Sequence, residues 1–252
     1  MNARRIEGAV ALVTGANRGI GRALTEALLT RGVRKLYATA RDPEALRTLR
    51  DERLVSLRLD VTHADQIRAA AEAAADVELV FNNAGLALPG GIADPALLDR
   101  ARREMEVNYF GPLQLLQRLA PTLARNGGGA VVIIGSTAGL TSLPIIPTYS
   151  ASKAALHSLT QAARILLGAQ GTSVFGVYPG PVDTDMTRGF EVPKSSPRDV
   201  AVTILDGIEA GHEDIFPDPF AVDFSRQFES SPKESERHMA AMAAAILSGS
   251  AA

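Results

Sequence analysis

The stretch that decides the fold is residues 14–21, which read Thr14-Gly15-Ala16-Asn17-Arg18-Gly19-Ile20-Gly21. A β-branched run precedes it at 9–14, and a helical pattern follows it at 20–31. Three glycines at such a turn permit a tight bend, close approach of the backbone to a diphosphate, and close packing of helix on strand. The free N–H groups at the helix start can hold the anion. Glycines alone would indicate only a tight turn, but the strand and helix around them favour a dinucleotide site.

Beyond this turn, short β-branched runs alternate with longer helical patterns rich in alanine and leucine. The alternation predicts right-handed crossovers and a doubly wound parallel sheet of the α/β class, with helices on both faces. Because no linker interrupts the chain, we expect one Rossmann-type domain over residues 1–252, with a cofactor half (1–130) and a catalytic and substrate half (131–252). The predicted strands are 9–14, 35–40, 54–59, 77–82, 130–135, 173–178 and 215–217, and the predicted helices are 20–31, 43–50, 62–75 with Thr62 as N-cap, 95–123, 149–167 and a tail from Ser230 with a frayed end.

The composition is that of an ordinary globular protein. The 252 residues, 46% hydrophobic and 21% charged, can bury a sizeable core. The absence of cysteine excludes disulfides, thiolate metal sites and cysteine nucleophiles, and the four histidines show no metal-ligand spacing, so we expect no metal. A net charge of −2 argues against a general nucleic-acid binder. No apolar run has the length of a secretory signal or a membrane span, so we expect a cytoplasmic protein without nucleic-acid or membrane partners.

The second predicted strand ends at Ala40-Arg41, where an NAD-specific site usually carries an acidic residue for the ribose 2′-hydroxyl. Arg41 offers a guanidinium instead, which pairs with phosphate through two parallel N–H bonds, and Arg18 in the glycine turn offers a second. Asp42 is expected to point to solvent or to cap the helix that begins at Pro43. The alternative is that Arg41 is a solvated surface charge. The pattern favours NADP(H) over NAD.

At this point the sequence clearly resembles the short-chain dehydrogenase/reductase family, in its shorter single-domain branch. The matching residues keep the family's order and spacing over about residues 7–200, and together they are highly specific. They are Thr14-Gly15-x-x-x-Gly19-x-Gly21, Leu59-Asp60-Val61-Thr62, Asn82-Asn83-Ala84-Gly85, Asn108, Ser136, Tyr149-x-x-x-Lys153, and Pro179-Gly180 followed by Thr184.

The resemblance implies where a bound dinucleotide lies. Family members place the residues that match Asp60 and Val61 at the adenine, and the stretch 83–85 at the ribose. They place 179–184 at the nicotinamide, where Thr184 bonds the carboxamide. Asn83 has the alternative of capping a strand end, and the turn at 179–180 that of an ordinary turn. The predicted cofactor-binding residues are Gly15, Asn17, Arg18, Gly19, Ile20, Gly21, Arg41, Asp60, Val61, Asn83, Ala84, Gly85, Tyr149, Lys153, Pro179, Gly180, Val182 and Thr184.

The predicted catalytic residues are Ser136, Tyr149, Lys153 and Asn108. Tyr149 and Lys153 are four apart on one helix, so their side chains share a face. A nearby ammonium favours phenolate, so we expect Lys153 to lower the phenol pKa from ~10 toward the working pH. Tyr149 would then give a proton to a carbonyl oxygen while NADPH gives hydride to the carbon, and in oxidation the tyrosinate would take the alcohol proton.

The other two predicted groups support this pair. Ser136 is expected to hydrogen-bond the same oxygen. The resemblance implies that Lys153 also holds the nicotinamide ribose and that Asn108 holds a water linking Lys153 to solvent. The alternatives are a chance Tyr–Lys spacing, a loop cap at Ser136 and a helix-interior hydrogen bond at Asn108.

The segment between Met186 and Ser196 is short where the family forms a mobile lid over the substrate, which predicts an open pocket tolerant of varied ketones or aldehydes. Gly135 stands where many relatives carry a second serine, a change that should leave catalysis intact. The expected pocket walls are mostly apolar. They are Thr137, Ala138, Leu140, Leu143, Ile145, Ile146, Pro181 and Phe190, of which Leu140 and Ile146 have the alternative of plain core.

Taken together, the residues favour an NADPH-dependent carbonyl reductase acting on a small organic molecule. One alternative is an alcohol or steroid-type dehydrogenase that works toward oxidation. The other is a nucleotide-sensing regulator without turnover, which the presence of both Tyr149 and Lys153 disfavours. Kinship implies a homodimer or homotetramer paired through the helices 95–123 and 149–167.

Overall fold

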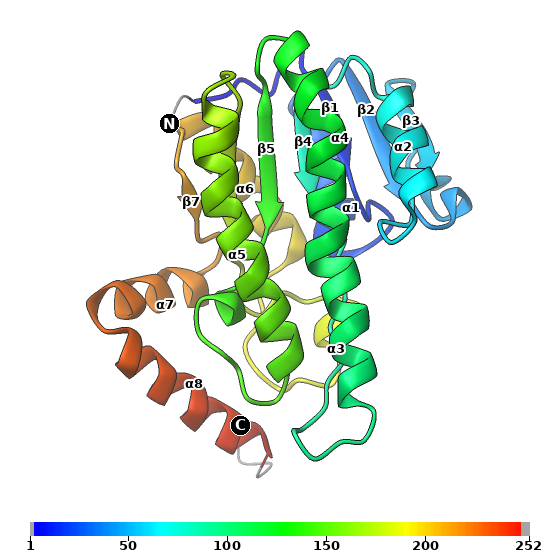
Figure 1. Ribbon diagram of the computed structural model, residues 1–252. Coiled ribbons are helices and arrows are strands. Elements are labelled where there is room, and N and C mark those ends of the chain that lie inside the picture. The colour runs from blue at the N-terminus through cyan, green and yellow to red at the C-terminus, as the bar shows by residue number, and fades with distance from the viewer. Residues whose placement is uncertain (1–2, 248–252) are drawn as a thin grey trace.

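A seven-stranded parallel sheet runs through the centre of the protein (Figure 1). The computed structural model describes residues 3–247. The strands lie in the order β3-β2-β1-β4-β5-β6-β7, so the chain moves outward from β1 to β3 and returns at β4. This confirms the predicted doubly wound α/β class. The strands are β1 (Val10–Val13), β2 (Lys35–Ala40), β3 (Leu54–Arg58), β4 (Leu79–Asn82), β5 (Ala130–Ile134), β6 (Ser173–Val177) and β7 (Asp214–Ile215).

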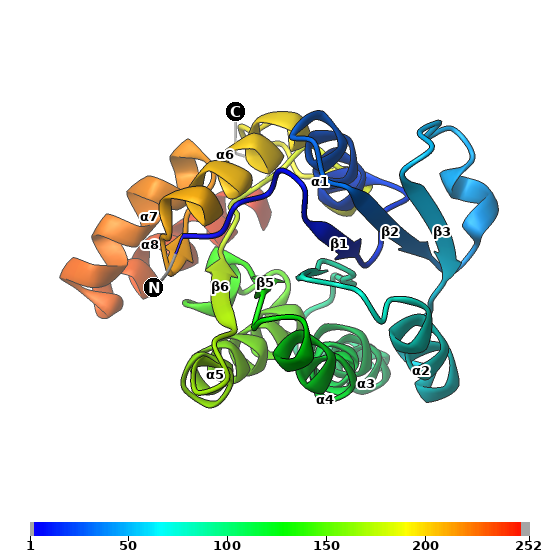
Figure 2. The same ribbon diagram turned by 90° about the horizontal axis from the view of Figure 1, so that it is seen from above.

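Both faces of the sheet are buried, and β1 shows how the sequence achieves this. Ala11 and Val13 belong to one core, and Val10 and Leu12 belong to the other, because successive side chains of a strand point to opposite faces. One face is covered by α1 (Gly19–Thr30) and α6 (Pro197–Ala210), as Figure 2 shows. The other face is covered by α2 (Ala64–Ala73), α3 (Leu97–Met105), α4 (Gly111–Arg125) and α5 (Pro147–Gly168).

The start of α2 differs from the prediction. Thr62 was expected to cap this helix, but the helix begins at Ala64 after His63, and neither residue supplies a side-chain cap. The Thr62 hydroxyl donates instead to Oδ1 of Asp60 at 2.7 Å, and the Thr62 N–H donates to the same oxygen at 3.0 Å. The threonine is therefore used to fix the Asp60 carboxylate at the end of β3.

The region after β2 is also shorter than predicted. It forms a single 3₁₀ turn, Pro43–Leu46, rather than a helix to residue 50. Asp42 caps this turn by accepting a hydrogen bond from the Glu44 N–H at 3.0 Å, which confirms one of its two expected roles.

The predicted helix 95–123 is divided into three parts. Between α3 and α4 lies a π-helical turn, Glu106–Phe110. Such turns add one residue to the helical repeat and often occur at functional sites. Here the turn places Asn108 inward, with its side chain fully buried.

The C-terminal part of the chain contains two helices that the sequence analysis did not predict, α6 and α7 (Pro219–Ser230). Each follows a capping residue and begins with proline at the first helical position, since Ser196 accepts from the Asp199 N–H and Asp218 accepts from the Ala221 N–H. The tail forms α8 (Pro232–Leu247), as predicted, while the last residues of the expected frayed end, 248–252, lie outside the described residues. In Figure 1, α7 and α8 lie beyond the carboxyl ends of the strands.

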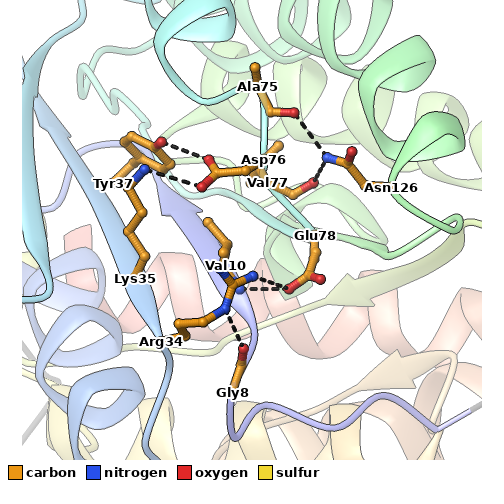
Figure 3. A network of polar contacts seen from close by, with 10 residues as sticks. All are labelled: Gly8, Val10, Arg34, Lys35, Tyr37, Ala75, Asp76, Val77, Glu78 and Asn126. Atoms are coloured by element: carbon orange, nitrogen blue, oxygen red, sulfur yellow. Dashed lines mark hydrogen bonds and ion pairs between the residues drawn. The ribbon is translucent and has the colours of Figure 1, made fainter.

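The amino ends of the strands are joined by a polar network (Figure 3). Asp76, just before β4, accepts from the Tyr37 hydroxyl at 2.7 Å and pairs with Lys35 at 3.1 Å. Glu78 accepts from the Val10 N–H at 2.8 Å, and the Asn126 amide donates to the Val77 carbonyl at 2.9 Å. These contacts hold β1, β2 and β4 in register at the end of the sheet opposite the cavity described below.

None of the helices within residues 3–247 combines the length and the apolar character needed to cross a bilayer.

Candidate active site

A cavity of about 740 Å³ opens at the carboxyl ends of the strands. Its walls come from the loops that follow β1 to β6, and also from α1, α3, α5, α7 and α8. Ligands of doubly wound sheets bind at this edge, where the strand order reverses. All the predicted cofactor-binding residues line the cavity, as do Ser136, Tyr149 and Lys153. Among the predicted catalytic residues Asn108 alone lies behind the wall.

The glycine turn after β1 is shaped for close approach of a ligand. A Cβ at Gly21 would lie 2.2 Å from the Gly15 carbonyl oxygen, so no other residue fits there. Gly15 has a φ of +67°, which side chains rarely adopt. The Asn83 amide donates to the Thr14 carbonyl at 2.8 Å and fixes the turn from β4. Asn83 therefore shapes the turn from the neighbouring strand.

The start of α1 is open to the cavity. Arg18 occupies the N-cap position, and no side chain of the described residues caps the helix. The first N–H groups of α1 thus keep their capacity to bind an anion, and the helix dipole adds to it. Together with the glycine turn, this arrangement fits the diphosphate of a dinucleotide.

The end of β2 presents a guanidinium to the same cavity. Arg41 is exposed and makes no hydrogen bond or ion pair with another described residue. The predicted second cation, Arg18, is instead paired with Asp185 at 3.1 Å on the surface. The Asp42 side chain caps the turn that begins at Pro43. Arg41 is therefore the group best placed to bind a phosphate on the ribose.

Asp60, at the end of β3, is held in its charged form. Burial acts to raise its pKa, but the hydrogen bonds from the Thr62 backbone and hydroxyl outweigh it, and the pKa lies below its usual value. The carboxylate is therefore a fixed acceptor at the edge of the cavity.

Tyr149 and Lys153 lie one turn apart on α5, and both are buried, with 8% and 4% of their surface exposed. The Lys153 ammonium donates to the Ile134 carbonyl at 2.8 Å and lies 5.8 Å from the centre of the Tyr149 ring. Ser136 lies two residues after β5, accepts a hydrogen bond from the Ala138 N–H at 3.2 Å, and acts to lower the pKa of Tyr149. Gly139 lets this loop pack on α5, since a Cβ there would lie 2.7 Å from the Lys153 carbonyl carbon. The structure thus brings together the three groups that the sequence predicted.

The pKa values of this pair differ from the prediction. Burial raises the pKa of Tyr149 to about 12; the Ser136 hydrogen bond lowers it, and the Glu104 charge adds to the rise. Burial also lowers the pKa of Lys153 to about 8. The expected lowering of the phenol pKa by Lys153 was therefore wrong for the protein without ligand. The physical reason is that removing both groups from water outweighs their mutual interaction.

Asn108 is used within the protein rather than at the cavity surface. Its amide nitrogen donates to the Leu86 carbonyl at 2.8 Å and to the Ser152 hydroxyl at 2.9 Å, and its oxygen accepts from the Leu86 N–H at 2.8 Å. A Cβ at Gly85 would lie 3.5 Å from the Asn108 oxygen and 3.7 Å from the Lys153 ammonium. These contacts make Asn108 an anchor for the segment after β4, and its role through a water stays a prediction.

The apolar wall is larger than predicted. Of the eight expected residues all but Leu140 line the cavity, so Leu140 was wrongly placed there. Phe220 on α7, and Met239 and Met242 on α8, also line the cavity, and no motif in the tail predicts them. Arg102 and Arg103 of α3 are exposed and lie at the border of the cavity. The helical spacing of Met239, Met242 and Ala243 was the available signal for an inward-facing stripe.

Comparison with known proteins identifies the family. Residues 9–194 match the family model described as short chain dehydrogenase. An uncharacterized oxidoreductase of Myxococcus xanthus is 35% identical over 228 residues, which cover 84% of this chain and 88% of the relative. The crystal structure of a short chain dehydrogenase from Burkholderia cenocepacia in complex with NADP has 37% identity and a TM-score of 0.89, covering 94% of this chain and 99% of that one.

A second crystal structure, of a short chain dehydrogenase/reductase from Burkholderia phymatum in complex with NAD, has 26% identity and a TM-score of 0.81, covering 91% and 96% of the two chains. The matched region contains the glycine turn and the Tyr149–Lys153 pair. The chain therefore belongs to the short-chain dehydrogenase/reductase family of oxidoreductases.

Proposed function

We propose that the protein is an NADPH-dependent carbonyl reductase, which converts ketones or aldehydes reversibly to alcohols. The observation that carries this proposal is the cluster of buried Tyr149, buried Lys153 and half-buried Ser136 in the cavity that the glycine turn also lines. A proton donor, an oxygen-binding hydroxyl and a cation at one end of a dinucleotide cavity are the groups that carbonyl reduction requires.

In the proposed reaction, the bound cofactor supplies a hydride to the carbonyl carbon. Tyr149 donates its phenolic proton to the carbonyl oxygen, so that the C=O bond becomes a C–OH group and the tyrosine becomes a phenolate. Ser136 hydrogen-bonds the same oxygen and stabilises the negative charge that develops there. Lys153 is one turn away on α5 and stabilises the phenolate until solvent returns a proton.

The raised pKa of Tyr149 supports reduction as the favoured direction near neutral pH. With a pKa of about 12, the phenol is protonated and ready to donate. Oxidation of an alcohol requires the phenolate, so activity as an alcohol or steroid-type dehydrogenase should increase with pH. A regulator without turnover would have no need for the buried phenol and ammonium, whose burial costs stability.

Arg41 supports the preference for NADPH. It lines the cavity and makes no ion pair with another described residue, so its guanidinium is available to a phosphate. The relative that is 37% identical to this chain was crystallised with NADP, and the one that is 26% identical with NAD. NADPH is proposed rather than NADH because this chain presents a guanidinium where an NAD site usually presents a carboxylate.

We propose in addition that the protein forms a homodimer or homotetramer. The subunits would pair through the helical regions 95–123 and 149–167, which include α4 and α5. Ile165 and Leu166 on α5 support it, since they are 79% and 72% exposed. A cytoplasmic location is proposed from the absence of cysteine, which suits a reducing compartment.

The test is NADPH consumption over a panel of aldehydes, ketones, ketoesters and quinones, with product chirality measured. Tyr149→Phe should lower kcat for the best substrate by roughly 10²- to 10⁴-fold, because the proton donor is lost. The affinity for NADPH, measured by fluorescence titration, should stay near that of the wild type. Tyr109→Phe is the matched control, since Tyr109 does not line the cavity. Undiminished turnover in Tyr149→Phe would exclude this acid–base role.

A further inference from the structure

We propose that α7 and α8 form the substrate-selecting wall of the active site, and that Met239 and Met242 favour carbonyl compounds bearing an extended apolar group. This inference rests on the function proposed above and adds the substrate class. We call residues 218–244 the C-terminal arm.

The start of the arm is held against the turn that follows β6 by hydrogen bonds and packing. Asp218, which is 4% exposed, accepts hydrogen bonds from the Gly180 N–H at 2.8 Å and from the Ala221 N–H at 2.9 Å. Phe220 packs over Gly180, where a Cβ would lie 2.4 Å from the Phe220 ring. The start of α7 therefore lies at the predicted nicotinamide end of the cavity and is held there by a buried carboxylate.

From this attachment the arm turns back along the cavity. Ser231 joins the two helices, with its N–H donating to the Gln227 carbonyl at 2.8 Å and its carbonyl accepting from the Ser235 N–H at 3.1 Å. Phe220, Phe224 and Phe228 form a stacked row along α7, with ring centres 6.5 Å and 5.9 Å apart. The row stiffens the first helix of the arm, on which α8 packs.

One face of α8 is turned toward the molecule. Ser235, Met239 and Ala243 follow each other at intervals of four and are buried, and Met242 lies beside them and is half-buried. Met239 and Met242 both line the cavity. Neighbours on the other faces, such as Arg237, are exposed. The stripe meets the cavity through two thioether side chains, whose flexibility lets them adapt to ligands of different shapes.

The charges around the cavity are distributed unevenly. Among the described lining residues after position 130, Lys153 and Asp185 alone are charged, and Asp185 is paired with Arg18. The remaining cations and anions come from the glycine turn, from the loops after β2 and β3, and from α3 and the π-helical turn that follows it. The arm carries none of the residues expected to contact the dinucleotide, so its apolar groups are available to the substrate. A charged or sugar-like substrate would lose hydration against this wall without a polar partner.

The experiment compares methyl ketones of increasing length, from 2-butanone to 2-nonanone, as substrates of the full chain with NADPH. Each methylene buried against the wall should raise kcat/KM about fourfold until the wall is covered. In Met239→Ala/Met242→Ala, kcat/KM for 2-nonanone should fall at least tenfold, and that for 2-butanone should stay within twofold. The control is Glu236→Ala/Arg237→Ala, which removes two exposed side chains of the same helix and leaves the net charge unchanged.

A second measurement separates this inference from the proposed function. Calorimetric titration of the NADPH-loaded protein with nonanamide reports binding without turnover, because the cofactor does not reduce an amide. Met242→Ala alone, at a half-buried position, covers the case in which the double variant fails to fold. Weaker amide binding in Met242→Ala with unchanged NADPH affinity supports the wall. Equal losses for both ketones in a folded variant, or unchanged amide binding, would overturn it. Absence of NADPH oxidation with every carbonyl compound, alongside amide binding that depends on Met242, would overturn the reductase proposal alone.

Discussion

The two ends of the cavity are built by different means. At the phosphate end, the glycine turn and the start of α1 present main-chain groups, and a Cβ at Gly21 would meet the Gly15 carbonyl at 2.2 Å. At the substrate end, Phe220, Met239 and Met242 present side chains from helices that follow the last strand. A site made of main chain tolerates almost no substitution, whereas a wall made of flexible side chains can be altered in small steps. Specificity is therefore expected to change at the second end before the first.

The largest effect that would test this contrast is expected at Gly21. In Gly21→Ala the new methyl group would collide with the Gly15 carbonyl, and the turn would have to move away from the phosphate position. We expect NADPH affinity to fall by about 100-fold or more, comparable to the loss of two charge-assisted hydrogen bonds. Fluorescence titration of NADPH measures it.

The matched control is Gly168→Ala, which also changes a helical glycine but places the methyl group in open space. It should leave NADPH affinity unchanged, and it should not lower the unfolding temperature, because alanine is the better helix former. Equal NADPH affinities in the two variants would contradict the claim that the main chain of the glycine turn binds the cofactor.

An intermediate effect is expected at Arg41, the side chain on which the phosphate end depends for its choice of cofactor. Arg41→Asp replaces the guanidinium by a carboxylate that repels the 2′-phosphate and accepts from a ribose hydroxyl. The ratio of kcat/KM for NADPH to that for NADH should fall by roughly 10- to 100-fold. Arg50→Asp, an exposed arginine away from the cavity, provides the control. An unchanged ratio in Arg41→Asp would assign the 2′-phosphate to other groups.

The smallest effect concerns Glu104, which lies behind the wall on α3. This side chain is fully buried; one carboxylate oxygen accepts from the Leu88 N–H at 2.7 Å, and the other finds no partner among the described residues. Its negative charge disfavours the Tyr149 phenolate, so Glu104→Gln should lower the pKa of Tyr149 from about 12. Phenolate formation should then begin at a lower pH. The loss of ketone reduction as the pH is raised should therefore also begin at a lower pH than in the wild type.

The chain suits this measurement because it has four tyrosines and no tryptophan. Ultraviolet titration of Glu104→Gln and wild type, each against its Tyr149→Phe counterpart, isolates the Tyr149 phenolate. A Tyr149 titration that is unchanged or moves upward in Glu104→Gln would exclude the proposed effect of Glu104 on the phenol.

The sequence predicted the parts of the site that depend on backbone geometry or on fixed spacing. The glycine turn could be recognised because steric limits permit few residues there. Tyr149 and Lys153 could be paired because a helix places residues four apart on one face. Strand β2 was predicted with its bounds, since a buried parallel strand is a short apolar run with clear ends.

The parts that escaped prediction depend on tertiary structure. Met239 and Met242 carry no motif, and their contribution follows from where α7 turns the chain. The pKa of Tyr149 could not be inferred from the nearby lysine, because burial of the whole cluster outweighs that pair. Thr62 has the sequence of a helix cap, but Asp60 competes successfully for its hydroxyl. The first two outcomes depend on how segments far apart in the sequence pack together, whereas the third is decided by Asp60, only two residues before Thr62.

The position of the arm after the last strand of the sheet has a practical consequence. Because α7 and α8 follow β7, they can be exchanged without interrupting any strand of the described sheet. Chimeras that keep residues up to the Asp218 anchor and take residues 219–244 from a relative should therefore change ligand preference, while the strands and the glycine turn stay the same.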